Sequence, residues 1–174
     1  MFIIEKPKTK NELLDDPKFQ HYSTIGDSIQ FLKRRNALAK VGLYVGRFSE
    51  LTAKDVVFLS LAKSRCNIMI VALESDYSVR LKKERSLVPA PAKERGFLVG
   101  SLPCVDWVYV YDEEHPELSV QSIAPDYIFT GLYSDDDKTL NIYKDRLVKI
   151  EHPFDVSELP RKKIPSKFFD LPVE

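Results

Sequence analysis

The sequence predicts an α/β fold, a Rossmann-like parallel sheet of about five strands with helices on both faces. Continuous apolar runs at residues 41–45 and 67–73 are typical of strands buried on both faces of a parallel sheet. Helical patterns separate such runs, and strands that alternate with helices favour one sheet wound by right-handed crossovers. Ligands of these sheets bind beyond the carboxyl ends of the strands, so the loop after residues 41–45 is the first place to look for a site.

The elements follow one another along most of the chain. Residues 1–25 carry charge, two prolines and few periodic apolar positions, which predicts an N-terminal arm. A helix is expected over residues 28–39, with Ile29, Phe31, Leu32 and Leu38 able to face a core. Further strands are expected at residues 106–111, 127–130 and 146–150, and further helices at 52–65, 93–102 and 116–124. The α/β domain then spans residues 26–160, and residues 161–174 form a C-terminal tail.

The composition indicates a globular protein without a net charge that would attract it to a charged partner. Lys and Arg total 26 and Asp and Glu total 26, so no net field favours nucleic acid or an anionic membrane. There is no continuous apolar run long enough for a membrane helix, and the first residues turn polar too early for a secretory signal. Cys66 and Cys104 lie in apolar contexts that suggest buried free thiols. We therefore expect a cytoplasmic protein with neither nucleic acid nor membrane as a partner.

The loop between the first strand and its helix holds the residues of most interest. Gly46 predicts a sharp turn after the strand, and Thr52-x-x-Asp55 stands just before an apolar helical run. That spacing is typical of a capping box, in which Thr52 and Asp55 bind the first amides of the helix. The alternative is that Lys54, Arg47 and either Lys82 or Lys83 supply positive charge to a phosphate. The three histidines show no metal-ligand spacing, so no metal site is predicted.

The segment of residues 41–55 resembles the first strand, loop and helix of the cytidylyltransferase-like nucleotidyltransferases, above all the ADP-heptose synthase and glycerol-3-phosphate cytidylyltransferase group. That family carries G-x-F-D-x-x-H-x-G-H here, and Gly46 and Phe48 match it. Further similar pieces follow in order, at residues 71–80, 88–95, 102–108 and 125–131. The resemblance covers roughly residues 26–160 and implies the nucleotidyltransferase fold, with a homodimer as the common assembly of related members.

The positions that carry the family chemistry differ in this chain. Ser49 stands for the Asp, Thr52 and Asp55 stand for the two His, and Lys54 stands for the Gly. In the family the two His stabilise charge that develops on the α-phosphate of the nucleotide. By the resemblance, the candidate nucleotide-binding residues are Gly46, Arg47, Phe48, Lys54, Arg80, Lys82, Lys83, Gly131 and Ser157. Ser157 is all that remains of the G-x-S-T-T stretch of the family, and the Asp that follows Gly131 there is missing.

Two functions are consistent with this pattern. The first is a catalytically impaired member of the family, a pseudoenzyme that serves in binding, regulation or structure and still holds a nucleotide or sugar phosphate. The second is a divergent enzyme that moves CMP or AMP from a nucleoside triphosphate, with Mg²⁺, to a sugar or polyol phosphate and releases pyrophosphate. In the second case Arg47, Lys54 and a basic residue of the segment 80–85 hold the phosphates.

Overall fold

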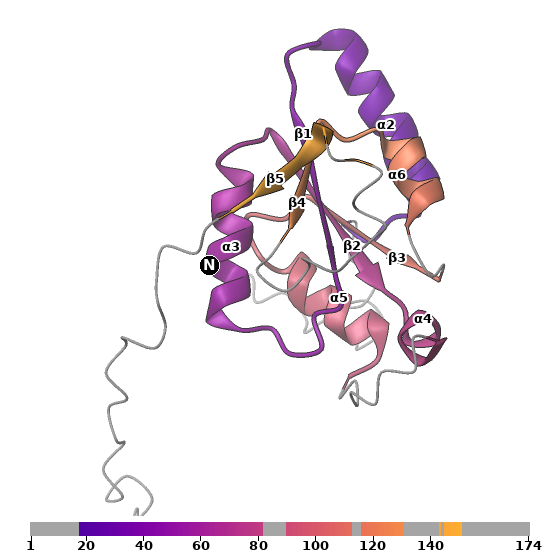
Figure 1. The fold of residues 1–174 in the computed structure, drawn as a ribbon. Helices are drawn as coiled ribbons and strands as arrows, with labels where there is room; N and C mark the ends of the chain where they lie inside the picture. The colour runs from indigo at the N-terminus through magenta and orange to yellow at the C-terminus, as the bar shows by residue number, and fades with distance from the viewer. Residues whose placement is uncertain (1–17, 82–89, 113–115, 131–142, 144, 151–174) are drawn as a thin grey trace, which may run out of the picture.

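The computed structural model describes residues 18–81, 90–112, 116–130, 143 and 145–150. Within them, parallel strands form one sheet in the order β3-β2-β1-β4-β5 (Figure 1). The strands are β1 (Val41–Gly46), β2 (Ile68–Glu74), β3 (Trp107–Tyr111), β4 (Tyr127–Thr130) and β5 (Leu147–Lys149). The helices are α2 (Tyr22–Arg35), α3 (Ala53–Lys63), α4 (Asp76–Leu81), α5 (Ala92–Gly100) and α6 (Glu117–Ile123). The predicted Rossmann-like α/β fold is confirmed.

The strand order places the loop after β1 at the point where the winding of the sheet reverses. From β1 the chain adds β2 and β3 on one side, and then returns to add β4 and β5 on the other. Gly46, the last residue of β1, pairs in register with Leu73 of β2. A Rossmann-like sheet opens a crevice at such a switch point, where helices on opposite faces leave the two central strands. The candidate loop therefore lies at the end of the sheet where ligands of this fold class bind.

Helices cover both faces of the sheet, and each face has its own core (Figure 1). On one face, Ile25 and Ile29 of α2 and Val120 and Ile123 of α6 pack against Leu43 and its neighbours. On the other face the core contains Phe58, Leu59 and Ala62 from α3 and Val99 from α5. Every one of these side chains is almost completely buried, which is the arrangement that continuous apolar strands require.

Helix α2 differs from the prediction in both its bounds and its buried face. The expected helix at residues 28–39 instead begins at Tyr22, after His21 accepts a hydrogen bond from the amide of Ser23. It ends before Asn36, whose extended backbone and side-chain bond to the amide of Leu38 stop the helix. The helix thus crosses the domain boundary predicted at residue 26.

The buried side of α2 is set by Ile25 and Ile29, four residues apart on one helix face. Of the four residues expected to face a core, Ile29 alone is buried. Leu38 is 84% exposed, and Phe31 and Leu32 are exposed as well. The prediction was wrong for these three because Leu38 lies beyond the end of the helix and α2 buries only Ile25, Gly26 and Ile29, all before Phe31.

Elsewhere, the predicted helices and strands agree with the structure to within a few residues. The basic segment after β2 begins as the short helix α4, and its remainder lies outside the described residues. The run of three aspartates at residues 135–137, most of the predicted arm and the tail at residues 161–174 also lie outside them. Cys66 and Cys104 are free thiols, and both are half-buried rather than buried. Among the described helices, none combines the length and apolar character needed to cross a membrane.

Candidate functional site

The loop after β1 is shaped by aromatic rings. The ring of Tyr44 lies 5.5 Å from that of Phe48 and 4.9 Å from that of Phe58, measured between centroids. A Cβ at Gly46 would stand 2.8 Å from Tyr44 Cε1 and 2.9 Å from Phe48 Cε2. Only a residue without a side chain fits at position 46, which explains the glycine at the turn.

Phe48 takes a backbone conformation that bulky residues rarely adopt. Its φ is 49°, in the left-handed region, while the residue is 8% exposed. Such strain costs of order 1–3 kcal/mol and persists only where the surroundings fix it. Burial of the Phe48 ring against Tyr44 supplies that constraint, so the loop keeps one shape as it leaves the sheet.

Thr52 and Asp55 form a capping box at the start of α3, as the sequence predicted. The carboxylate of Asp55 accepts hydrogen bonds from the amide of Thr52 at 2.8 Å and from its hydroxyl at 2.6 Å. In return the amide of Asp55 donates to Thr52 Oγ1 at 3.4 Å. Both residues that the resemblance places at the family's histidine positions therefore hold the helix start, and Asp55 brings negative charge to it.

The phenol of Tyr44 lies within the influence of this carboxylate. Burial, together with the smaller effect of the nearby charge of Asp55, raises the pKa of Tyr44 to about 12. The hydroxyl consequently stays protonated and neutral at physiological pH. Tyr44 can pack and donate a hydrogen bond in this loop, but it does not act as a base there.

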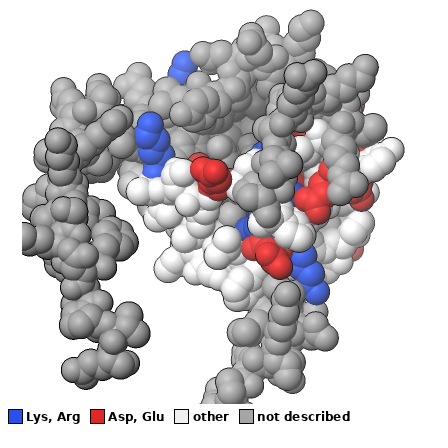
Figure 2. All heavy atoms as spheres, turned by 90° about the horizontal axis from the view of Figure 1, so that it is seen from below, with Lys and Arg blue, Asp and Glu red and all other residues white. Residues whose placement is uncertain are grey.

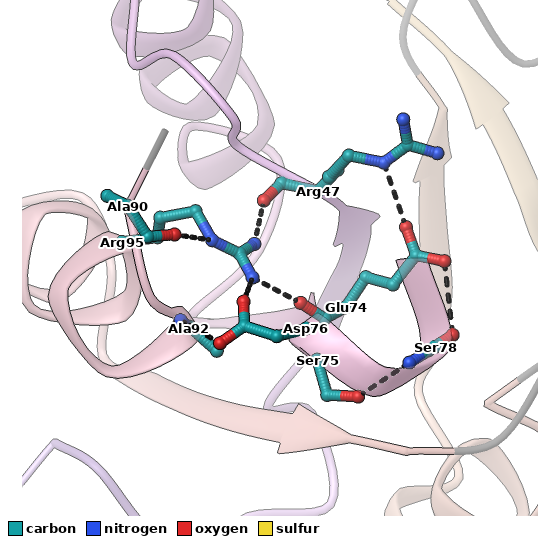
Figure 3. Close-up of polar contacts among 8 residues, drawn as sticks. All are labelled: Arg47, Glu74, Ser75, Asp76, Ser78, Ala90, Ala92 and Arg95. Atoms are coloured by element: carbon teal, nitrogen blue, oxygen red, sulfur yellow. Dashed lines mark hydrogen bonds and ion pairs between the residues drawn. The ribbon is translucent and has the colours of Figure 1, made fainter. Parts of the chain in front are cut away.

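A cluster of charged and polar side chains joins the carboxyl ends of β1 and β2 (Figure 3). We call it the carboxyl-end cluster; it comprises Arg47, Glu74, Asp76, Ser78 and Arg95. Arg47 Nε donates to Glu74 Oε2 at 3.1 Å, and Ser78 Oγ donates to Glu74 Oε1 at 3.1 Å. The Glu74 side chain is 5% exposed, so this ion pair lies at the edge of the protein interior.

Arg95 is the centre of the cluster and its most deeply buried charged member. Its side chain is 1% exposed, and Nη2 donates to Asp76 Oδ1 at 2.7 Å and to the Glu74 carbonyl at 3.0 Å. Nη1 donates to the carbonyl of Arg47, and Nε donates to that of Ala90 at 3.0 Å. One side chain from α5 thus ties the β1 loop, the end of β2 and the segment before α5 to one another.

Among the described side chains of the cluster and the β1 loop, positive and negative groups lie next to one another. Arg47 is paired with Glu74 and Arg95 with Asp76, while Lys54 and Asp55 share the first turn of α3. Figure 2 views the molecule from the side where β2 ends, and on the visible described atoms blue and red lie intermingled. Among the described residues no group of three His, Cys, Asp or Glu is placed to hold a metal ion.

The structure describes some of the predicted site residues, and the others lie outside the described ranges. Gly46, Arg47 and Phe48 lie in the β1 loop, and Lys54 is exposed in the first turn of α3. Arg80 lies in α4, where only its backbone is described. Lys82, Lys83, Gly131 and Ser157 lie outside the described residues, so their roles stay predictions.

Sequence reasoning did not assign a role to Glu74, Asp76 or Arg95. The available signal was their position inside segments that resemble family motifs, at residues 71–80 and 88–95. A charged residue at the end of a buried apolar strand, such as Glu74, is a candidate for a buried ion pair. The partners themselves, which are 19 residues apart for Asp76 and Arg95, become visible only in the fold.

Two known proteins that are similar to this chain in sequence carry the same name. No protein-family model matches the sequence. "Bifunctional protein HldE" of Helicobacter pylori (strain P12) is 37% identical over 86 residues, which is 49% of this chain and 19% of that protein. The protein of the same name from Erwinia tasmaniensis is 32% identical over 103 residues, 59% of this chain and 22% of that protein. The match therefore spans about a fifth of the length of these relatives.

The fold has a counterpart among solved structures. The crystal structure of the lipopolysaccharide core biosynthesis protein from Thermoplasma volcanium GSS1 superposes with a TM-score of 0.57. The superposition covers 66% of this chain and 98% of that one, at 20% sequence identity. Taken with the sequence similarity and the motifs around Gly46, this shared fold places the chain in the cytidylyltransferase-like nucleotidyltransferase superfamily.

Proposed function

We propose that this chain binds a nucleotide or a sugar phosphate at the carboxyl ends of its central strands without transferring a nucleotidyl group. The observation that carries the proposal is the capping box of Thr52 and Asp55, which fills the positions of the family's two histidines. In-line transfer depends on positioning and on positive groups at the developing charge of the α-phosphate. The site instead offers a hydroxyl and a carboxylate that are bonded to each other.

The size of the expected defect follows from the chemistry. Removal of one donor that stabilises a developing charge typically lowers the rate by about 10²–10³. Here two such donors are replaced, and the carboxylate of Asp55 repels an anion that the amide groups of a helix start would otherwise attract. A protein with this loop is expected to retain the fold and a ligand site while losing the reaction, which makes it a pseudoenzyme with a binding or regulatory role.

Retention of a binding site is supported by the parts of the loop that are kept. Gly46 and the strained Phe48 preserve the sharp turn at the switch point of the sheet, and Arg95 holds the surrounding segments together. Backbone strain that the fold maintains is typical of functional sites. Lys54 is exposed in the first turn of α3, directly after the same loop, and is the candidate for direct contact with a phosphate.

Isothermal titration with CMP, AMP, CTP and ATP, each with and without Mg²⁺, tests the proposal. We expect measurable binding of at least one of these ligands, weakened by Lys54→Ala. The matched control is Lys93→Ala, because Lys93 is also exposed in the first turn of a helix, α5, but outside the β1 loop. Absence of binding at millimolar nucleotide would overturn the binding role and leave a fold retained for interaction alone.

A second function, a divergent nucleotidyltransferase, is favoured by the similarity to the HldE proteins. It requires Mg²⁺ and a nucleoside triphosphate, with Arg47 and Lys54 holding the phosphates in place of the histidines. Pyrophosphate release from CTP or ATP that depends on Lys54 would support this function over the first.

The proposal also includes a homodimer in the cytoplasm, which rests on the resemblance to related members. Sedimentation equilibrium of the full chain measures the oligomeric state. A single monomeric species across micromolar concentrations would contradict the homodimer.

A further inference from the structure

The side chain of Arg47 is turned back onto the protein rather than outward from the loop. Its Nε donates to Glu74 Oε2 at 3.1 Å, and the side chain is 24% exposed (Figure 3). Its own carbonyl oxygen accepts from Arg95 Nη1, so the residue is anchored through both its backbone and its side chain. Arg47 is one of the candidate phosphate contacts of the loop, and its charge is already engaged by a carboxylate.

Glu74 is a fixed partner in this pair. It is the last residue of β2, the strand next to β1, and the whole residue is 3% exposed. Its second carboxylate oxygen accepts from Ser78 Oγ at 3.1 Å, and Ser78 is itself completely buried. The residue that follows, Ser75, bonds through its amide to the Tyr111 carbonyl at 3.0 Å. The carboxylate therefore has little freedom to move away when a ligand arrives.

A buried carboxylate beside an arginine changes what that arginine can recognise. An ion pair presents almost no net charge, and an incoming phosphate gains from Arg47 only by competing with Glu74. A phosphate chain with several charges is affected most, because repulsion from the fixed carboxylate grows with the charge of the ligand. The carboxylate of Asp55 adds negative charge at the start of α3, where the same loop ends.

We propose that Glu74 is a specificity-determining residue that neutralises Arg47 and makes the site select a ligand with a single phosphate over a triphosphate. This inference rests on the proposed function for the location of the site, and it narrows the ligand class to nucleoside monophosphates or sugar monophosphates. Release of Arg47 from Glu74 should convert the site into one that prefers polyphosphates.

The test is a double-mutant cycle on the full chain with inorganic tripolyphosphate and inorganic phosphate as calorimetric probes. Glu74→Gln keeps an oxygen for Ser78 and removes the charge that holds Arg47. We expect it to raise the tripolyphosphate affinity roughly tenfold, the size of a single charge interaction near a protein surface, and to change the phosphate affinity much less. In the Arg47→Gln/Glu74→Gln protein the gain should disappear.

Glu50→Gln is the matched control, because Glu50 is an exposed carboxylate of the same loop and solvent screens its charge. An unchanged or weaker tripolyphosphate affinity in Glu74→Gln would overturn the inference, as would an equal gain when Arg47 is absent. Arg47→Gln alone provides a test that does not require Glu74→Gln to fold. It should lower tripolyphosphate binding by less than about twofold, and a loss near tenfold would contradict the inference.

The probes contain no nucleoside, so this result is separable from the binding role proposed above. A gain in Glu74→Gln that requires Arg47, in a protein that binds no nucleotide, would keep the charge inference and remove nucleotide recognition. Nucleotide binding without such a gain would keep nucleotide recognition and contradict the charge inference.

Discussion

The two ends of strand β1 each carry a group of cations and carboxylates, and they differ in how far water reaches them. At the start of the strand, Asp126 is bonded to the amide of Val41 at 2.9 Å and pairs with Lys33 at 3.0 Å and Lys40 at 3.5 Å. We call this group the amino-end cluster. Its charged side chains are 24–48% exposed. In the carboxyl-end cluster one partner of each pair is buried: the side chains of Arg95 and Glu74 are 1% and 5% exposed, whereas those of Asp76 and Arg47 are 38% and 24% exposed.

The difference in burial indicates that the two clusters have different structural roles. Exposed ion pairs contribute about 0–1 kcal/mol to stability, because water and salt screen them and long side chains lose freedom. A buried pair adds little net stability as a whole, but removal of one partner leaves an uncompensated charge and is costly. The amino-end cluster therefore holds one strand to its neighbours, whereas the carboxyl-end cluster fixes the relative positions of three loops around the ligand end of the sheet.

The largest expected effect comes from Arg95→Met. Loss of the guanidinium leaves the carbonyls of Arg47, Glu74 and Ala90 without this donor, at a cost of about 3–5 kcal/mol in the free energy of unfolding. Loss of the pair with Asp76 adds little, because that carboxylate is 38% exposed. Urea unfolding measures the change. Arg65→Met, at an exposed position beyond α3, is the control and should alter stability by less than about 0.5 kcal/mol. Equal effects at the two positions would remove the distinction between the clusters.

Gly46→Ala is expected to have the next largest effect. The added methyl group meets the Tyr44 and Phe48 rings at 2.8 and 2.9 Å, and such overpacking costs about 1–3 kcal/mol. Gly100→Ala serves as the comparison, because its Cβ would lie at an ordinary 3.6 Å from Val108. Thermal unfolding should separate the two variants. A Gly46→Ala protein as stable as Gly100→Ala would show that the rings at the β1 loop are not fixed.

Thr52→Ala and Asp55→Ala should each cost about 0.5–2 kcal/mol through loss of the capping box. Because the two side chains bond each other, the double variant should lose less than the sum of the single losses. Urea denaturation of all four proteins gives this coupling. Additive losses would mean that the two residues do not act as one cap. They would also count against a capping role for the residues at the positions that the resemblance assigns to the family's histidines.

Asp126→Asn tests the amino-end cluster and should have the smallest effect. Burial raises the pKa of Asp126, but the Val41 amide and the charges of Lys33 and Lys40 outweigh it, so the pKa lies below its ordinary value. The carboxylate therefore stabilises the fold above the unfolded pKa of about 3.9, and this contribution is lost as pH falls through the lower folded value. The wild-type advantage should be at most about 1 kcal/mol near neutral pH and vanish in strong acid. A constant difference in urea midpoint across that range would contradict it.

Much of the fold was predictable because buried parallel strands leave a continuous apolar signal. Residues 41–45 and 67–73 gave β1 and β2 to within a residue at each end, and Thr52-x-x-Asp55 gave the cap of α3. The start of α2 was missed because its cap is His21, whereas the residues usually found there are Ser, Thr, Asp and Asn.

The candidate site was predictable in place but not in composition. Gly46 and Arg47 could be assigned to the loop from the motif that surrounds them. Glu74 and Arg95 could not, because their importance lies in contacts with residues 27 and 48 positions away along the chain. Only the register of the sheet brings these partners together, and a single sequence carries no direct record of it.

The central claim, ligand binding without nucleotidyl transfer, is tested most directly by pyrophosphate release. The full chain is incubated with Mg²⁺ and a saturating concentration of CTP or ATP, together with a panel of sugar and polyol phosphates as acceptors. The account predicts no release above the level without protein, from a chain that binds a nucleotide or a sugar phosphate by calorimetry. Release that turns over many times per protein and falls in Lys54→Ala would contradict it, and would mean that the loop of Thr52 and Asp55 supports catalysis.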